Sequence, residues 1–340
     1  MTTACSRKLR ILTWHVHGNY LWYLTQVPHQ FFLVTDAARS AHHTGRSGTL
    51  PWGDNVHEAP VERIRQMDFD VVLYQSRAEF EHARELLSAA QRRLPAIYLE
   101  HDPPLNAPTD ERHWADDGRI HVVHVTGFNA LMWEHRESPV SVIEHGVRLL
   151  APARYQGSRE QGVAVVNNLG SRGRRLGPDV FLAMREQIPL VLVGMGADRL
   201  GGQGEVANRD LPGFIAQFRF FFNPIRYTSL GLAVVEAMMV GLPIVGLATT
   251  EMPTVITNGV NGWLDTRPQR LADVMRELLH DPALARRWGE AARRTAEQRF
   301  GIGRFVADWD ALLTRVAGSL PDSSSDSSAD SSPDRCLEPR

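Results

Sequence analysis

The segment from Arg226 to Leu264 contains the residues most able to do chemistry. Gly231 precedes an apolar run, Leu232 to Val240, that fits one short helix and contains a single charge, Glu236. The first backbone N–H groups of a helix have no intrahelical acceptor and lie at the positive end of its dipole, so the amides from Leu230 to Ala233 suit a phosphate group. A carboxylate in the first turns of a buried helix is rarely left without a partner, which indicates a role for Glu236.

A membrane span is an alternative interpretation of the apolar run from Leu230 to Ala248. A carboxylate at the centre of a bilayer costs about 2.5 to 3.5 kcal/mol, and Gly241, Leu242 and Pro243 interrupt the helix midway. The residues after Pro243, Ile-Val-Gly-Leu-Ala, are typical of a strand that is covered on both faces. We therefore expect two short buried elements joined by a tight turn.

Length and composition favour a large soluble enzyme with two domains. The chain has 340 residues, of which 43% are hydrophobic, and this exceeds what one compact core usually serves. Its formal net charge of -2 argues against broad binding to nucleic acid or anionic membranes. Cys5 and Cys336, near opposite ends, fit a reducing compartment and exclude a cysteine-built metal site. Residues 1–16 contain too short an apolar run for a signal peptide, so we expect a cytoplasmic protein.

The elements that must position these residues alternate between strand-like and helix-like patterns in two halves of similar size. This order predicts an α/β fold with two doubly wound Rossmann-like domains. The expected strands are Arg10–Val16, Phe31–Thr35, Val71–Tyr74, Ala96–Leu99, His121–Val125, Val140–Ile143, Gly162–Asn167, Leu190–Gly194, Phe218–Phe222 and Pro243–Leu247. The expected helices are Glu79–Arg93, Asp179–Gln187, Leu232–Val240, Arg270–His280, Pro282–Arg299 and Ile302–Val316, and His17-Gly18-Asn19 is expected to be a turn.

The cluster of motifs in the second half resembles the group 1, or family 4, glycosyltransferases, and the similarity spans roughly residues 140 to 316. It rests on four stretches: Arg226–Thr266, Leu278–Pro282, Arg299–Phe300 and the hinge Val142–Val147. The resemblance implies a retaining enzyme of GT-B fold, in which two Rossmann-like domains face each other across a cleft. The expected parts are an acceptor-side domain (1–147), a nucleotide-sugar-binding domain (148–301), a helix that crosses back to the first domain (302–317) and a Ser- and Asp-rich disordered tail (318–340).

The family has two carboxylates spaced Glu-x7-Glu around a Phe-Gly turn. Glu236 matches the second and by resemblance would hydrogen-bond the ribose hydroxyls, whereas Thr228 occupies the position of the first. The missing hydrogen bond to a charged group is worth about 1.5 to 3 kcal/mol, so Thr228 implies a different sugar, weaker donor binding or a protein that no longer catalyses. The expected donor-binding residues are Gly18, Gly196, Thr228, Ser229, Leu230, Gly231, Leu232 and Glu236.

The segment Asn167–Gly177 resembles the family's Gly-Arg…Lys-Gly loop. Arg172 and Arg175 are the residues carried over to offset the charge on the departing diphosphate, with Arg174 close behind and Arg226 as a further candidate. An ordinary solvated basic loop is the alternative.

The resemblance also assigns residues at the ends of other strands. His101 lies in the position of the family's cleft histidine and would orient the acceptor or hydrogen-bond the donor sugar; the alternative is a histidine that caps a strand end for structural reasons. Gly18 would approach the donor phosphate and the acceptor, and the turn at Gly196, through Arg199, would line the nucleobase. Glu251 is expected to serve structure more than chemistry.

The expected function is metal-independent transfer of a sugar from a nucleotide-diphosphate donor to a saccharide, lipid or protein acceptor, with no cofactor. One alternative is a nucleotide-binding protein of the same fold that has lost catalysis. Another is a nicotinamide-dependent oxidoreductase, but Gly194-Met195-Gly196 lacks the third glycine of that fingerprint because Arg199 stands there. No nucleic-acid partner and no transmembrane segment are expected, and contact with a membrane surface is compatible with the sequence.

Overall fold

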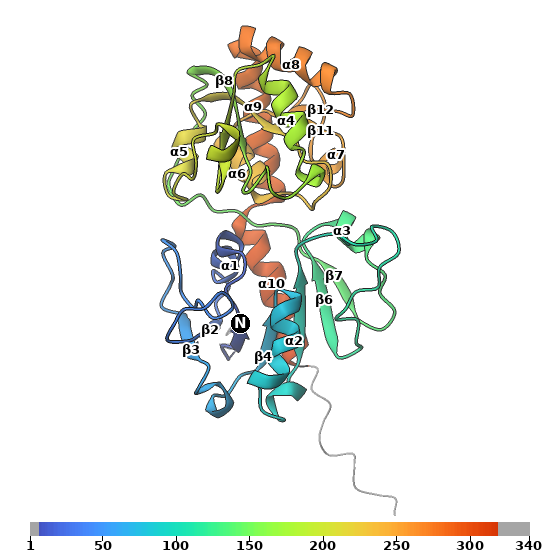
Figure 1. Cartoon of the computed structure of the whole chain (residues 1–340). Coiled ribbons are helices and arrows are strands. Elements are labelled where there is room, and N and C mark those ends of the chain that lie inside the picture. Colours follow the sequence, from blue (N-terminus) through green and yellow to red (C-terminus); the bar gives the residue numbers. More distant parts are fainter. Residues whose placement is uncertain (1–6, 319–340) are drawn as a thin grey trace, which may run out of the picture.

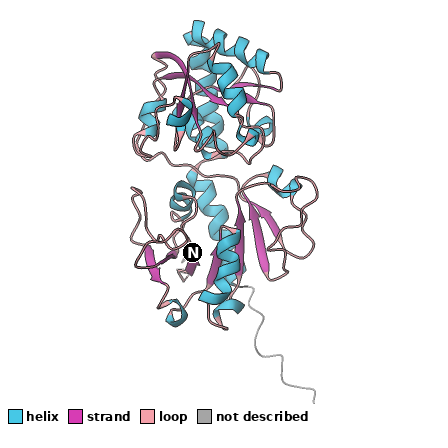
Figure 2. Ribbon diagram, viewed as in Figure 1, coloured by secondary structure: helices cyan, strands magenta, loops and turns pink. Residues whose placement is uncertain are grey.

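The computed structural model of the chain describes residues 7–318. It consists of two α/β bodies joined by residues 143–158 and by the last helix (Figure 1). Figure 2 shows helices flanking the strands in each body. The predicted disordered tail beyond Gly318 and both cysteines lie outside the described residues.

The first body is built on a parallel sheet of seven strands in the order β3-β2-β1-β4-β5-β6-β7. The strands are β1 (Arg10–Thr13), β2 (Gln30–Thr35), β3 (Val56–Pro60), β4 (Val71–Tyr74), β5 (Ala96–Glu100), β6 (Ile120–His124) and β7 (Val140–Val142). Its helices are α1 (Gly18–Leu24), η1 (Ile64–Gln66), α2 (Arg77–Leu86), η2 (Gln91–Arg93) and α3 (Gly127–Met132). The strand order reverses between β1 and β4, as in a doubly wound Rossmann sheet.

The second body has a parallel sheet of five strands in the order β12-β11-β10-β8-β9. The strands are β8 (Arg159–Val165), β9 (Leu190–Val193), β10 (Phe218–Asn223), β11 (Ile244–Leu247) and β12 (Gly262–Asp265). The helices are η3 (Arg174–Leu176), α4 (Pro178–Arg185), η4 (Ala197–Leu200), α5 (Leu211–Ile215), α6 (Leu232–Val240), α7 (Met252–Val255), α8 (Pro268–His280) and α9 (Pro282–Arg299). Here the order reverses between β8 and β10, the other common doubly wound arrangement.

The ten expected strands are all present, and the predicted fold of two doubly wound sheets is confirmed. The edge strands β3 and β12 were not predicted, because their partly exposed, mixed sequences lack a clear apolar period. The expected turn at His17 was wrong, since α1 begins at Gly18. The helix expected over Glu79–Arg93 ends at Leu86 because Leu87 is extended, and a short 3-10 turn follows.

The long apolar run forms two separate buried elements, so the membrane-span interpretation was wrong. Helix α6 ends at Gly241, whose φ of 101° is a left-handed conformation that favours glycine, and β11 starts at Ile244. Among residues 7–318, no helix combines the length and apolar character that crossing a bilayer requires.

The last helix, α10 (Ile302–Ala317), leaves the second body and packs against α1 and β4 of the first (Figure 1). Phe305 and Trp309 are fully buried in this contact, as the helical spacing predicted. Gly146 allows the close approach, because a Cβ placed there would lie 2.1 Å from the Cβ of Phe305. The backbone N–H of Val147 also donates to the Phe300 carbonyl at 2.9 Å, so the two connections between the bodies run side by side.

Candidate active site

A cleft of about 360 Å³ lies between the two bodies. Its walls are the start of α1 in the first body and the start of α6, with the ends of β8 and β9, in the second. The lining residues include His17, Gly18, Asn19, Asn167, Gly194, Leu232, Ala233 and Glu236. Ligands of open α/β sheets bind outside the carboxyl ends of the strands, and both sheets direct carboxyl ends toward this cleft.

The start of α6 is open to this cleft. Gly231 is the N-cap residue with extended backbone (φ -68°, ψ 136°), and no side chain caps the first amides. A Cβ at Gly231 would meet no atom within 4 Å, so there is free space beside the helix start. Leu232 and Ala233 line the cleft directly. Their N–H groups therefore lie where an anionic ligand can be bound.

The residues just before α6 hold its start in place. The side chains of Ser229 and Leu230 are buried, and the Leu230 carbonyl accepts a hydrogen bond from Nε2 of His145 at 2.6 Å. Burial lowers the pKa of His145 to about 4, so this ring is a neutral donor at neutral pH. Thr228 is half-buried and, like Ser229 and Leu230, is not among the lining residues of the cleft. These three residues therefore lie beside the cleft wall, and their contact with the donor stays a prediction.

Glu236 lies at the cleft but is held by the opposite body. Its side chain is only 8% exposed, and its Oε1 accepts hydrogen bonds from the Tyr23 hydroxyl at 2.8 Å and from Nδ2 of Asn19 at 3.2 Å. Burial raises the pKa of Glu236, and the two hydrogen bonds from α1 act in the opposite direction. Burial and the neighbouring carboxylate keep the pKa of Tyr23 well above its ordinary value, so the phenol remains a donor. Both contacts end on Oε1.

Arg175 is not among the residues that line the cleft, but its guanidinium group is incompletely hydrogen-bonded. Its Nη1 is buried and has no acceptor among the described residues, which is unusual for a guanidinium group. Its carbonyl accepts the N–H groups of Arg226 (2.9 Å) and Tyr227 (3.2 Å), so the arginine loop is tied to the segment that leads into α6. Gly177 permits this contact: its φ is +76°, and a Cβ there would lie 2.0 Å from the Pro224 carbonyl oxygen.

The other arginines of the loop differ in their surroundings. Arg172 is exposed. Burial is the main cause that lowers the pKa of His17 in the cleft, and the positive charge of Arg172 is close enough to lower it further. Arg174 lies 3.3 Å from Asp179. Arg226 donates from both Nη atoms to the same carboxylate, at 2.6 and 2.7 Å. Arg226 is therefore engaged within the protein and does not face the cleft as a free cation.

His101 lies behind the cleft wall. Its ring contacts those of His17 (centroids 4.2 Å apart) and Tyr20 (4.8 Å), and its Nε2 is buried without a partner among the described residues. Burial, with smaller effects from His17 and His145, holds the pKa of His101 well below its ordinary value. At neutral pH His101 is neutral, and His17 is the histidine that lines the cleft.

The two predicted glycines have different surroundings. Gly18 lines the cleft, and a Cβ there would lie 3.2 Å from Nε2 of His15, so the wall is tightly packed. Gly196 does not line it, because its left-handed conformation (φ +69°) turns the chain into η4. Gly194 and Met195 line the cleft in its place. Arg199 is exposed and also absent from the lining.

The sequence-based reasoning missed the residues that α1 contributes. Asn19 and Tyr23 reach Glu236, which lies 217 and 213 residues further along the chain. The Gly18-to-Leu24 stretch has no apolar period and no capping side chain, so its helix gave little signal. Asn167 also lines the cleft, and its place at the carboxyl end of a predicted strand could have indicated this.

Glu251 has the structural role that was predicted. Its Oε2 accepts the backbone N–H of Phe128, at the start of α3, at 2.8 Å, and its Oε1 accepts the Thr254 hydroxyl at 2.5 Å. It thereby links the second body to the first. Within the described part of the chain, no group of three or more His, Cys, Asp or Glu side chains is arranged to hold a metal ion.

Residues 183–295 match the family model described as Glycosyl transferases group 1. Short segments are similar to curated proteins. The N-acetyl-alpha-D-glucosaminyl L-malate synthase of Bacillus anthracis is 34% identical over 88 residues, which are 25% of this chain and 23% of that protein. The D-inositol 3-phosphate glycosyltransferase of Streptomyces avermitilis is 37% identical over 71 residues, 20% of this chain and 15% of that protein. The matched parts span less than a quarter of the curated relatives' length.

Solved structures are similar over nearly the whole chain. A sucrose-phosphate synthase from Thermosynechococcus elongatus superposes with a TM-score of 0.69 at 15% identity, covering 92% of this chain and 100% of that one. Anabaena HepE, solved in complex with UDP and glucose, gives a TM-score of 0.65 at 16% identity with the same coverage. At these identities the likeness concerns the fold, which is GT-B. The chain therefore has GT-B architecture, and residues 183–295 of its second body are similar to the group 1 glycosyltransferases.

Proposed function

We propose that this protein transfers a sugar from a nucleotide-diphosphate donor to an acceptor, with retention of the anomeric configuration. The observation that carries the proposal is the open start of α6 in the interdomain cleft, at Leu232 and Ala233. It combines unpaired amide donors and a positive helix end with the nearby arginine loop, and this set suits a diphosphate.

The donor would lie mainly on the second body. Its diphosphate would accept hydrogen bonds from the amides at Leu232 and Ala233, which line the cleft, and from Nη1 of Arg175, which does not line it but belongs to the neighbouring loop with Arg172. Oε2 of Glu236 would accept hydrogen bonds from the ribose hydroxyls, because both hydrogen bonds from α1 are donated to Oε1. We propose a uridine nucleotide, since HepE of the same fold was solved with UDP.

The reaction would need no carboxylate base. The acceptor hydroxyl oxygen forms a bond to the anomeric carbon on the face from which the phosphate oxygen departs, and a leaving phosphate oxygen takes the acceptor proton. Negative charge grows on the departing diphosphate, so fixed amide dipoles and guanidinium groups lower the barrier most effectively there. His17, which is neutral at neutral pH because of burial, can orient hydroxyl groups without a net charge, and His101 packs behind it.

The acceptor, a saccharide, lipid or protein, would bind on the side of the first body. We place the reaction in the cytoplasm, because the two cysteines of the chain fit a reducing compartment.

A second candidate is a nucleotide-binding protein without turnover. Thr228 favours it, since a neutral side chain stands where the family has a carboxylate. Two measurements separate the candidates. Thermal shift with a panel of nucleoside diphosphates identifies the base, because a bound ligand stabilises the native state by mass action. Incubation with the matching radiolabelled nucleotide sugar then tests catalysis: release or transfer of the sugar supports the transferase, and tight binding without either supports the inactive protein. Absence of any nucleotide binding would refute both.

A further inference from the structure

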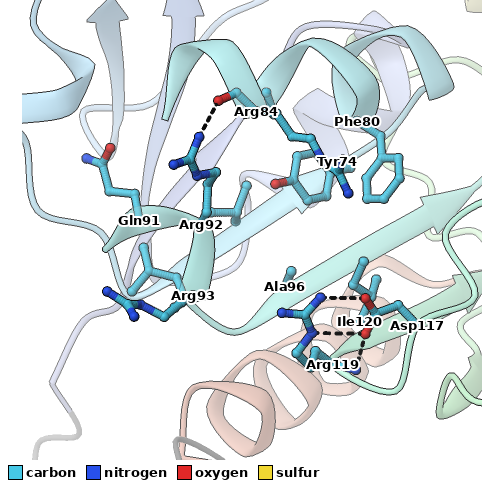
Figure 3. A pocket seen from close by; sticks show the side chains of 13 residues that line it. Tyr74, Phe80, Arg84, Gln91, Arg92, Arg93, Ala96, Asp117, Arg119 and Ile120 are labelled. Atoms are coloured by element: carbon cyan, nitrogen blue, oxygen red, sulfur yellow. Dashed lines mark hydrogen bonds and ion pairs between the residues drawn. The ribbon is translucent and has the colours of Figure 1, made fainter. Parts of the chain in front are cut away.

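A second cavity, of about 260 Å³, lies in the first body and is formed by α2, η2 and the starts of β5 and β6. Figure 3 shows it from close by. Ala96 and Ile120, which line it, are the first residues of their strands. The donor cleft lies beyond the opposite, carboxyl ends of the sheet, so the two sites are separate.

The floor of this cavity is apolar. Tyr74, Ala96 and Ile120 belong to the hydrophobic core yet keep 8–9% of their surface exposed, and Phe80 adds a further ring. Figure 3 shows the rings of Tyr74 and Phe80 side by side. Such a surface can accept the organic part of a small ligand.

The rim is strongly basic. Arg84, Arg92, Arg93 and Arg119 line the cavity with a single carboxylate, Asp117, which leaves a formal surplus of three positive charges. The chain as a whole has a net charge of -2. Positive charge is therefore concentrated at this cavity, and such a concentration attracts anions.

The arginines are partly pre-arranged. Arg119 is held by Asp117, with N–O distances of 2.7 and 3.1 Å, and Nη1 of Arg92 donates to the Arg84 carbonyl at 2.8 Å. In Figure 3 these two arginines lie on opposite sides of the cavity. The guanidinium groups of Arg84 and Arg93 form no hydrogen bond or ion pair with any residue between 7 and 318. Several N–H donors thus remain for a ligand.

We infer that this cavity binds the phosphate group of a phosphomonoester whose organic part is apolar. A phosphate dianion is attracted by the surplus of positive charge at the rim and accepts paired hydrogen bonds from guanidinium groups. The apolar floor of the cavity would shield the attached apolar group from water. A soluble organic phosphate and the phosphate headgroup of a lipid share this chemistry. The inference does not depend on the donor site.

The test uses the full chain and phenyl phosphate, whose ring and phosphate correspond to the floor and the rim. We expect Arg84→Gln/Arg93→Gln to weaken its binding about tenfold or more, because each hydrogen bond to a charged group is worth at least this factor. Arg287→Gln/Arg294→Gln is the matched control: it removes the same charge from exposed arginines of α9 that have no partner among the described residues. Inorganic phosphate should bind more weakly than phenyl phosphate because it cannot use the floor.

Two further arms locate the site and identify the ligand's source. Arg175→Gln alters the proposed donor site, so unchanged phenyl phosphate binding in this variant shows that the ligand does not use that site. Vesicles of phosphatidic acid in phosphatidylcholine test the lipid source: capture that depends on Arg84 and Arg93, without binding of phenyl phosphate, supports a headgroup site. Equal binding by all variants, or no binding of either probe at about 0.15 M salt, would overturn the inference.

Discussion

The substitution Glu236→Gln tests both the position and the charge of the proposed ribose-binding residue. The amide has nearly the same shape, and its oxygen can still accept the hydrogen bonds that Tyr23 and Asn19 donate to Oε1. The change removes the charge and replaces Oε2 by an NH2 group. Binding of a nucleoside diphosphate should therefore weaken while the contact between the bodies persists.

The expected loss follows from the geometry at Glu236. Only Oε2 is left for the ligand, so one or two ribose hydroxyls can use the carboxylate. A hydrogen bond to a charged acceptor is worth about 1.5 to 3 kcal/mol and a neutral one about 0.5 to 1.5 kcal/mol, so each exchange costs about 1 kcal/mol. The dissociation constant should rise about fivefold to thirtyfold.

Stability should change in the opposite direction. Burial raises the pKa of Glu236 in the folded protein above its value in the unfolded chain, so the folded protein favours the protonated acid. The free energy of unfolding of the wild type therefore falls as the pH rises from the pKa of the unfolded chain through the pKa of the folded protein. The Gln variant lacks this loss. The free energy of unfolding of the Gln variant minus that of the wild type should therefore be larger above this pH range than at low pH.

Isothermal titration calorimetry with UDP measures the change in affinity. Urea denaturation between about pH 5 and 8 measures the change in stability. Glu236→Ala is the companion variant, which should lose donor affinity sharply and keep the fold. An unchanged UDP dissociation constant in both variants would remove Glu236 from the site. A stability difference that does not vary with pH would contradict the buried, titrating carboxylate.

Four further substitutions or truncations follow from the same structure. Tyr23→Phe removes the 2.8 Å hydrogen bond to a buried carboxylate and should lower the free energy of unfolding by about 1.5 to 3 kcal/mol, measured by urea denaturation. Arg172→Ala/Arg175→Ala should lower kcat more than thermal stability, and full activity would identify the loop as ordinary surface. Gly177→Ala should cost about 2 kcal/mol or more of stability, from backbone strain and the contact with a carbonyl; an unchanged Tm would refute this. Truncation after Gly318 should leave activity unchanged, and a loss would show that the tail takes part.

Much of the fold could be predicted because it depends on neighbouring residues. The apolar run before Gly241 and the one after Pro243 indicated α6 and β11, and both are present with the bounds nearly as predicted. The open helix start at Gly231 also followed from the sequence, since no capping side chain is available there. Strands β3 and β12 were missed because an edge strand buries one face only partly.

The candidate site was predicted less completely. The sequence offered Arg172, Arg175 and Arg226 as candidates, and the folded chain separates two of them: Asp179 engages Arg226, whereas a guanidinium nitrogen of Arg175 stays buried without a partner among the described residues. His101 was chosen from its place at a strand end, yet His17 is the ring that reaches the cleft.

The sequence by itself determined the two doubly wound sheets and the glycine start of α6, because periodicity and turn residues act over a few positions. Only the tertiary structure decided which side chains meet across the cleft. Tyr23 and Asn19 reach Glu236 because the two bodies bring α1 beside α6, and a carboxylate buried between them must find its donors there. That choice depends on how two distant segments pack, which no local pattern encodes.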